Sequence, residues 1–256
     1  MDLEIRGLTK RFGGIVALDD VTFDVDEGRI IGLIGPNGAG KTTVFNCVSR
    51  FYDPDEGAIS FGGVDLLRLP PHAVIRTGVA RTFQQAELFK SMTVLDNLMV
   101  GQHTQLDGRR FGPLRFLIQP WQEERLLRRR ALELIDFLDL EKVRDMPAGA
   151  LPFGLQKKVD LARALVSNPR LILLDEPAGG LSHEELQDLG KLILHIRDQL
   201  NVTVLLVEHH MDLVMGVSDR VCVLDFGRKI AEGTPTEVRN DPNVIEAYLG
   251  DQDAQA

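Results

Sequence analysis

The sequence predicts an α/β protein built on a largely parallel β-sheet with helices on both faces. Three predominantly apolar runs have the character of strands that are buried on both sides, at 29–35, 171–176 and 202–210. Amphipathic helical patterns lie between these runs, the clearest of them at 183–200. Apolar strands that alternate with helices along a chain are typical of parallel sheets.

The chain begins with short segments in which polar and apolar residues alternate. Residues 3–8 and 21–25 show this pattern, and the sequence GGIVALDD joins them. Alternation of this kind predicts half-buried strands. The first buried run follows, and it leads into a glycine-rich loop and then into a helical pattern that begins at about Lys41.

The middle of the chain, at about 93–159, has a helical pattern that a Gly- and Pro-containing segment interrupts at 107–120. We interpret it as a helical subdomain inserted into an α/β core made of 1–92 and 160–233, all within a single domain of 1–256. The tail at 234–256 predicts two short helices. Each has a proline near its start, where a helix tolerates proline.

Composition narrows the classes of partner and compartment. The formal net charge of −9 over 256 residues argues against nucleic acid as the main partner, because phosphate backbones require a basic face. No apolar run reaches about 18 residues, and the N-terminus is charged from its second residue, unlike a secretory signal. Cys47 and Cys222 are expected to be buried thiols in a reducing compartment. We therefore expect a cytosolic protein.

The segment GPNGAGKT at 35–42 fits the pattern G-x-x-x-x-G-K-[ST]. Its glycines let backbone N–H groups converge on phosphate oxygens, Lys41 places a cation on the outer phosphates, and Thr42 offers a hydroxyl to Mg²⁺. A chance glycine loop is the alternative, but the position between a buried strand and a helix argues against it. We predict that nucleotide is bound by Gly35, Pro36, Asn37, Gly38, Ala39, Gly40, Lys41, Thr42 and Thr43.

Acidic residues and a histidine follow two later buried runs. Asp175 and Glu176 end the run at 171–176, where ligands bind in open α/β sheets. We expect Asp175 to bind Mg²⁺ through water, and Glu176 to orient or deprotonate an attacking water. His209 follows a third apolar strand, at a position suited to sensing a γ-phosphate. An acidic turn and a structural histidine are the plainer alternatives.

The segment LPFGLQKKVDLARAL at 151–165 predicts a turn that leads into a helix. Pro152 restricts one backbone angle and Gly154 permits angles that other residues avoid. Apolar residues then recur at helical spacing from Leu155. Anions bind at such helix starts, but ordinary helices begin in the same way.

Together and in this order, these motifs resemble the ATP-binding subunit of ABC transporters over nearly the whole chain. The resemblance implies a P-loop NTPase (ABC ATPase) core with a largely parallel sheet, an N-terminal antiparallel β subdomain and an inserted helical subdomain. It implies that Phe12 stacks on adenine, unless Phe12 is a core residue. It also implies that Gln84, or else Gln85, forms the glutamine loop and helps to hold Mg²⁺. His209 matches the switch histidine, and the segment at 178–182 matches the D-loop.

The signature turn of that family reads Leu-Ser-Gly-Gly-Gln and grips the γ-phosphate of ATP on the other subunit of a head-to-tail dimer. The matching residues here are Leu151, Pro152, Phe153, Gly154 and Leu155. The serine hydroxyl and glutamine amide are missing, and Pro152 has no backbone N–H, whereas Gly154 and the helix N-terminus remain. A weaker phosphate contact and a loss of closure at this half-site both fit the sequence. The intact Glu176 and His209 favour a working enzyme.

Within the family, the chain resembles the ATPases of branched-chain amino acid importers. The similarity lies in 81–103, in a long insert from Gln105 to about Arg130, and in the ending at 233–250. It implies ATP and Mg²⁺ as cofactors. It also implies membrane-spanning subunits, a second ATPase that is identical or different, and an extracytoplasmic binding protein reached indirectly. The location implied is cytoplasmic, peripheral on the inner face of the cell membrane, with no nucleic acid partner.

Several alternatives stay open at this point. ATPases of urea or short-chain amide importers look similar, and so does the lipopolysaccharide-export ATPase, although that type is not expected to have the long insert. A GTPase would need an Asn-Lys-x-Asp guanine reader, which the sequence lacks. Soluble ABC ATPases that act on DNA or ribosomes usually carry two nucleotide domains or a long coiled-coil insert. A binding-only subunit is a further alternative, and the altered signature turn is the best argument for it. The transported molecule is not encoded in this chain.

Overall fold

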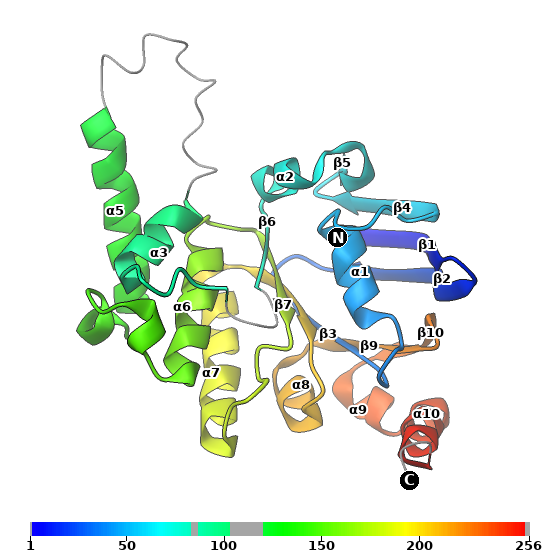
Figure 1. Ribbon diagram of the computed structural model, residues 1–256. Helices are drawn as coiled ribbons and strands as arrows, with labels where there is room; N and C mark the ends of the chain where they lie inside the picture. The colour runs from blue at the N-terminus through cyan, green and yellow to red at the C-terminus, as the bar shows by residue number, and fades with distance from the viewer. Residues whose placement is uncertain (1, 83–86, 103–119, 254–256) are drawn as a thin grey trace. The chain divides into compact units, whose positions relative to one another are not determined.

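The computed structural model describes residues 2–82, 87–102 and 120–253 (Figure 1). The chain divides into two compact units. The first, here called the sheet unit, consists of Met1–Arg81 and Arg170–Ala256, and the second, the helical unit, consists of Thr82–Pro169. The segment at 93–159, which the sequence predicts to be a helical subdomain, belongs to the helical unit.

Six of the described strands of the sheet unit form one sheet, in the order β10-β9-β3-β8-β7-β6. All neighbours in this sheet are parallel except the edge pair β10 and β9. The prediction of a largely parallel sheet is therefore confirmed. The strands are β3 (Ile30–Ile34), β6 (Val79–Arg81), β7 (Leu171–Asp175), β8 (Thr203–Val207), β9 (Arg220–Asp225) and β10 (Arg228–Gly233).

A second sheet of the same unit is antiparallel, with the order β2-β1-β4-β5 among the described strands. Its first two strands contain the alternating segments at 3–8 and 21–25, so this part of the fold is also confirmed. The strands are β1 (Leu3–Phe12), β2 (Ile15–Val25), β4 (Glu56–Phe61) and β5 (Val64–Asp65).

Helices cover both faces of the parallel sheet at its central strand β3. Ile31 and Leu33 share an apolar cluster with Phe45 of α1 (Lys41–Val48). The intervening Gly32 faces the other way, where a Cβ atom would lie 2.6 Å from a methyl carbon of Val214 in α8 (Met211–Val217). Because side chains alternate across a strand, α1 and α8 lie on opposite faces.

The remaining helices of the sheet unit agree with the sequence pattern. The long helix α7 (His183–Leu200) has the predicted bounds and packs against α8. The tail forms α9 (Pro235–Arg239) and α10 (Pro242–Asp253), each beginning at a proline as predicted. The short helix α2 is Pro71–Val74, and 3-10 turns lie at Leu66–Arg68 and Ile75–Thr77.

The helical unit contains α3 (Val94–Gly101), α5 (Pro120–Phe137) and α6 (Phe153–Leu165), and α3 packs against both of the others. Thr93 caps the start of α3 with a capping box. Its hydroxyl accepts from the amide of Asp96, and the Asp96 carboxylate accepts from the amide of Thr93. Short 3-10 turns lie at Glu141–Val143 and Ala148–Ala150. Most of the predicted break at 107–120 lies outside the described residues.

One local prediction was wrong. The sequence pattern places Gly154 in a turn before the helix, but α6 begins at Phe153 and Gly154 lies in its first helical turn. The physical reason is Pro152, which takes the extended N-cap conformation with φ of −54° and ψ of 152°, so the helix begins two residues before Leu155.

Both cysteine thiols are buried, as the sequence predicts. Cys47 lies in α1 and Cys222 in β9, and neither is exposed. Burial raises the pKa of Cys47 to about 11 and that of Cys222 to about 12. Only the thiolate is a nucleophile, so both thiols should be inert at pH 8.

A thiol titration checks this expectation. Native protein at pH 8 should show no rapid reaction with Ellman's reagent, and denaturation in guanidinium should release both thiols. Because the pKa values are raised, reactivity should appear only as the pH rises towards 11. One thiol equivalent that reacts within seconds in native protein would contradict the burial.

None of the helices in the described ranges carries an apolar stretch long enough to cross a lipid bilayer.

Candidate active site

The loop at 35–40 joins β3 to α1 and can be built only with glycine at its ends. Gly35 has a φ of 150°, and a Cβ atom there would lie 2.0 Å from the carbonyl oxygen of Leu224. Gly40 has a φ of 101°, and a Cβ atom would lie 2.6 Å from the carbonyl oxygen of Ala17. Between them, Asn37 is exposed at the tip of the loop. The chain is therefore curled tightly, with its tip open to a ligand.

Lys41 places its ammonium group inside this curl. The side chain is buried, and its Nζ donates to the carbonyl oxygens of Gly35 at 2.7 Å and Pro36 at 2.8 Å. Thr42 is exposed at the start of α1, and Thr43 is half-buried. A phosphate group would offer the ammonium a charged acceptor in place of two neutral carbonyls, which makes a stronger hydrogen bond.

Asp175 lies at the carboxyl end of β7 and forms a buried ion pair. Its Oδ2 accepts from Nη2 of Arg81 at 2.7 Å, and the two side chains are 6% and 11% exposed. Nη1 of Arg81 also donates to Asn46 in α1 at 2.8 Å. Arg81 therefore links β6, β7 and α1. Arg81 could not be predicted from the sequence, because its pairing with Asp175 depends on β6 lying beside β7.

Replacing Arg81 should destabilise the sheet unit. Arg81→Gln removes the guanidinium that pairs with the buried Asp175 carboxylate, and breaking a buried pair in this way costs about 3 kcal/mol. We expect a corresponding fall in the free energy of unfolding, measured with urea in the absence of nucleotide. Arg81→Lys should lower the free energy of unfolding by less, because lysine keeps the positive charge and loses only one of the two Nη donor groups.

A matched control for this variant is Arg129→Gln. Arg129 pairs with Glu133 at 3.1 Å, but both side chains are largely exposed, so the free energy of unfolding should hardly change. Equal urea midpoints for Arg81→Gln and the wild type would show that the Arg81–Asp175 pair does not stabilise the fold.

Glu176 and His209 lie at the ends of adjacent strands and touch. His209 Nε2 lies 2.5 Å from Oε1 of Glu176, and the amide of Glu176 donates to the carbonyl of Val207 in β8 at 2.9 Å. Glu176 has a φ of 47°, an uncommon conformation for a residue with a side chain. Strained backbone of this kind clusters at functional sites.

Glu208, for which the sequence predicts no role, is a buried carboxylate beside this pair. It is 1% exposed, and its Oε1 accepts from the amide of Ala178 at 2.6 Å. Its Oε2 accepts from the amides of His209 at 2.9 Å and His210 at 3.3 Å, and lies 3.0 Å from Nδ1 of His210. The feature of the sequence that could have indicated this role was a charged residue at the end of an apolar strand.

Phe12 ends β1 with 41% of its surface exposed, so the alternative of a core phenylalanine is excluded. Its ring meets Tyr52 edge-on at 5.1 Å between centroids, and the ammonium of Lys10 lies 5.2 Å from its centroid. An exposed aromatic face is what stacking on a base requires.

The structure places most of the predicted site residues in the sheet unit: Phe12, the loop residues 35–43, Asp175, Glu176 and His209. Gln84 lies outside the described residues, and so does Gln85. The predicted signature turn belongs to the helical unit, where Pro152 is the N-cap of α6 and offers no side-chain cap among the described contacts. The side-chain amide of Gln156, in the first turns of α6, donates to the carbonyl oxygen of Leu151 at 2.8 Å.

The first turn of α6 keeps the backbone amides that the signature turn is predicted to use. The amides at the start of a helix have no intrahelical acceptors, and they point out of its positive end. Phe153 is 48% exposed, with the ammonium of Lys157 5.6 Å from its ring centroid. The turn therefore keeps backbone donors although it lacks a serine hydroxyl.

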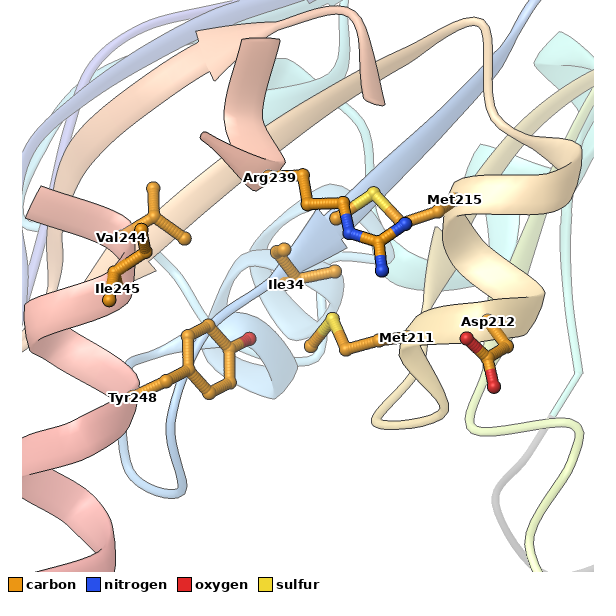
Figure 2. Close-up of a pocket in the computed structure, with 8 residues that line it drawn as sticks. All are labelled: Ile34, Met211, Asp212, Met215, Arg239, Val244, Ile245 and Tyr248. Atoms are coloured by element: carbon orange, nitrogen blue, oxygen red, sulfur yellow. The ribbon is translucent and has the colours of Figure 1, made fainter. Parts of the chain in front are cut away.

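A separate hollow of about 320 Å³ lies between α8, α9 and α10 of the sheet unit (Figure 2). Its lining consists of Ile34, Met211, Asp212, Met215, Arg239, Val244, Ile245 and Tyr248. Figure 2 shows the Tyr248 hydroxyl directed into the hollow, on the side where Ile34 and Met211 lie. Among the described residues, none that is predicted to bind nucleotide or metal lines this hollow.

Family models match the chain in two places. Residues 18–179 match the model described as ABC transporter, and residues 228–254 match the model described as branched-chain amino acid ATP-binding cassette transporter.

Curated relatives and solved structures match over almost the whole length. The high-affinity branched-chain amino acid transport ATP-binding protein BraF of Pseudomonas aeruginosa is 44% identical over 249 residues, covering 97% of this chain and 98% of BraF. LivG of Escherichia coli, which has the same description, is 43% identical with the same coverage.

Among solved structures, a nucleotide-free ATP-binding cassette from an ABC transporter is 34% identical with a TM-score of 0.83, covering 96% of this chain and 98% of that one. A cassette in its ADP conformation is 33% identical with a TM-score of 0.84, covering 97% and 98% of the two chains. The resemblance drawn from the motifs is confirmed: the chain belongs to the ABC transporter family, as an ATP-binding protein.

Proposed function

We propose that the chain is the ATP-binding and ATP-hydrolysing subunit of an ABC importer for branched-chain amino acids. The observation that supports ATP hydrolysis is the contact of His209 with Glu176, at 2.5 Å. Both residues lie in the unit that also contains the phosphate loop. The substrate class rests on BraF and LivG, which are named for branched-chain amino acid transport, and on the match at 228–254.

The phosphate loop binds the triphosphate of ATP. Its backbone amides surround the phosphate oxygens, and Lys41 turns from the carbonyls of Gly35 and Pro36 to the outer phosphates. Phe12 stacks on the adenine ring. The exposed Phe12 ring and the open tip of the loop support this assignment.

The residues present fit Mg²⁺. Thr42 offers an exposed hydroxyl, Asp175 a carboxylate, and the helix that begins with Lys41 packs against the strand that Asp175 ends. These are the hard oxygen ligands that Mg²⁺ prefers, with water and phosphate completing the shell. Gln84 is the third proposed protein ligand. When bound, Mg²⁺ neutralises charge on the β- and γ-phosphates.

Glu176 acts on the attacking water, which it orients or deprotonates, and His209 contacts both Glu176 and the γ-phosphate. The partner ATPase completes the site with its own signature turn, while the turn at 151–155 serves the partner's ATP through the amides at the start of α6. ATP binding closes the two subunits on each other, and release of phosphate reopens them. The motion is passed to membrane-spanning subunits, with which the chain associates at the cytoplasmic face.

A genetic exchange tests the proposal. In the organism that encodes the chain, replacing it with a Glu176→Gln copy should reduce uptake of labelled leucine, isoleucine and valine at least about tenfold. Arginine uptake serves as the internal control. Normal leucine uptake combined with lost urea or amide uptake would assign the chain to the other class of importer.

A binding-only subunit is the second candidate, and the observation in its favour is the signature turn Leu-Pro-Phe-Gly-Leu. The discriminating measurement is ATP turnover by the assembled transporter. Because Glu176 and His209 lie in this chain, phosphate release should depend on them. Transport unaffected by Glu176→Gln would favour the binding-only role.

A further inference from the structure

Glu208 uses its two carboxylate oxygens on two different loops. Oε1 accepts from the amide of Ala178, in the segment that follows Glu176. Oε2 accepts from the amides of His209 and His210, in the segment that follows β8, and lies 3.0 Å from Nδ1 of the His210 ring. A carboxylate is planar and rigid, so a side chain bonded on both sides fixes the spacing of the two loops.

The two loops that Glu208 joins carry the two groups assigned to hydrolysis. Glu176 lies two residues before Ala178, and His209 lies one residue after Glu208. The amide of Gly179 donates to the Glu176 carbonyl at 3.2 Å, so the loop is a compact turn in which a shift at Ala178 is passed to Glu176. The 2.5 Å contact of His209 with Glu176 lies between the same two loops that Glu208 joins.

The burial of Glu208 argues that this spacing is its task. A carboxylate that is 1% exposed is costly to bury unless its lone pairs are used, and here four contacts use them. An apolar side chain would fill the same space at no such cost, but it could not bond both loops. We propose that Glu208 is a positioning residue that holds the His209 ring against Glu176, and through it the water-directing carboxylate of Glu176.

This inference rests on the roles assigned above to Glu176 and His209. Glu208→Gln is the variant to test, because it has nearly the same shape but carries one acceptor and one N–H₂ donor. One of the two loops then meets a donor in place of an oxygen. We expect the kcat for ATP hydrolysis to fall about tenfold to a hundredfold. The KM for ATP and the Kd for nucleotide should stay within about twofold, because the phosphate loop is untouched.

A double-mutant cycle with His209→Ala separates positioning from general loosening. If Glu208 acts through His209, adding Glu208→Gln to His209→Ala should lower kcat by less than about twofold. Effects that multiply in the double variant would show two independent roles and would overturn the proposal. Wild-type kcat in Glu208→Gln alone would overturn it as well.

An NMR signal that does not depend on ATP turnover tests the bond between Glu208 and Ala178 directly. The amide of Ala178 donates a short hydrogen bond of 2.6 Å to Glu208, so in wild-type protein its proton should resonate well downfield in the ¹H–¹⁵N spectrum, and it should move upfield in Glu208→Gln. An ordinary ¹H chemical shift for the Ala178 amide in the wild type would overturn the proposed link between the two loops through Glu208, whatever the variants show.

Glu237→Gln is the matched control. Glu237 also accepts from a backbone amide, that of Thr234 at 2.7 Å, but it lies on the surface at the start of α9. This variant should leave both kcat and the Ala178 resonance unchanged. Absence of ATP turnover in the wild-type transporter would count against the proposed function, while the Ala178 resonance would still decide the role of Glu208.

Discussion

Glu176→Gln is expected to bind MgATP with wild-type affinity and to hydrolyse it about 10²- to 10⁴-fold more slowly. The amide has the size of the carboxylate but takes no proton from water, and it weakens the contact with Nε2 of His209. Binding is spared because the phosphates are held by the loop and Lys41. The measurements are phosphate release in a single turnover and nucleotide affinity by calorimetry.

The control for this variant is Glu184→Gln. Glu184 is an exposed residue in the first turn of α7, only eight positions further along, and its replacement should leave turnover unchanged. Full turnover by Glu176→Gln would exclude Glu176 as base or water-positioning group. Loss of nucleotide affinity would instead show that Glu176 supports the binding site.

Lys41→Ala should weaken ATP binding about tenfold to a hundredfold, the loss expected when a hydrogen bond between two charged groups is removed. The change also removes two hydrogen bonds to the carbonyls of Gly35 and Pro36, so the free energy of unfolding must be measured alongside. Calorimetry with MgATP and MgGTP gives the affinities, and a preference for ATP is expected of the wild type.

Lys191→Ala is the matched control for charge. Lys191 pairs with Asp188 at 2.9 Å on the exposed side of α7, and the two side chains are 75% and 69% exposed. Its removal changes the net charge by the same amount but should leave nucleotide affinity unchanged. An unchanged affinity in Lys41→Ala, in a protein that is folded, would refute the role of the ammonium group.

The parts of the fold that were predictable depend on neighbours in the chain. Helix α7 has the predicted bounds because apolar spacing and Ser182, whose side chain caps it, lie within the segment itself. The buried strands β3, β7 and β8 were visible as apolar runs for the same reason. The phosphate loop could be recognised because its glycines, Lys41 and Thr42 act within eight consecutive positions.

The parts of the site that were missed depend on strand order. Arg81 meets Asp175 across 94 positions of sequence, and Glu208 meets Ala178 across 30. No local pattern encodes the order β8-β7-β6, which brings these ends to one edge of the sheet. The early start of α6 was missed for a different reason, because a Pro-x-Gly sequence is equally compatible with a turn and with a helix cap.

Local chemistry in the chain was thus enough to predict which groups would bind phosphate, act on water and sense the nucleotide. How those groups restrain one another emerged only from the packed sheet: the ion pair of Asp175, the positive φ of Glu176 and the double contact of Glu208. The physical reason is the distance along the sequence over which each kind of interaction acts. Backbone preference and side-chain periodicity act over a few residues, whereas the partner of a buried charge is set by which strands lie side by side.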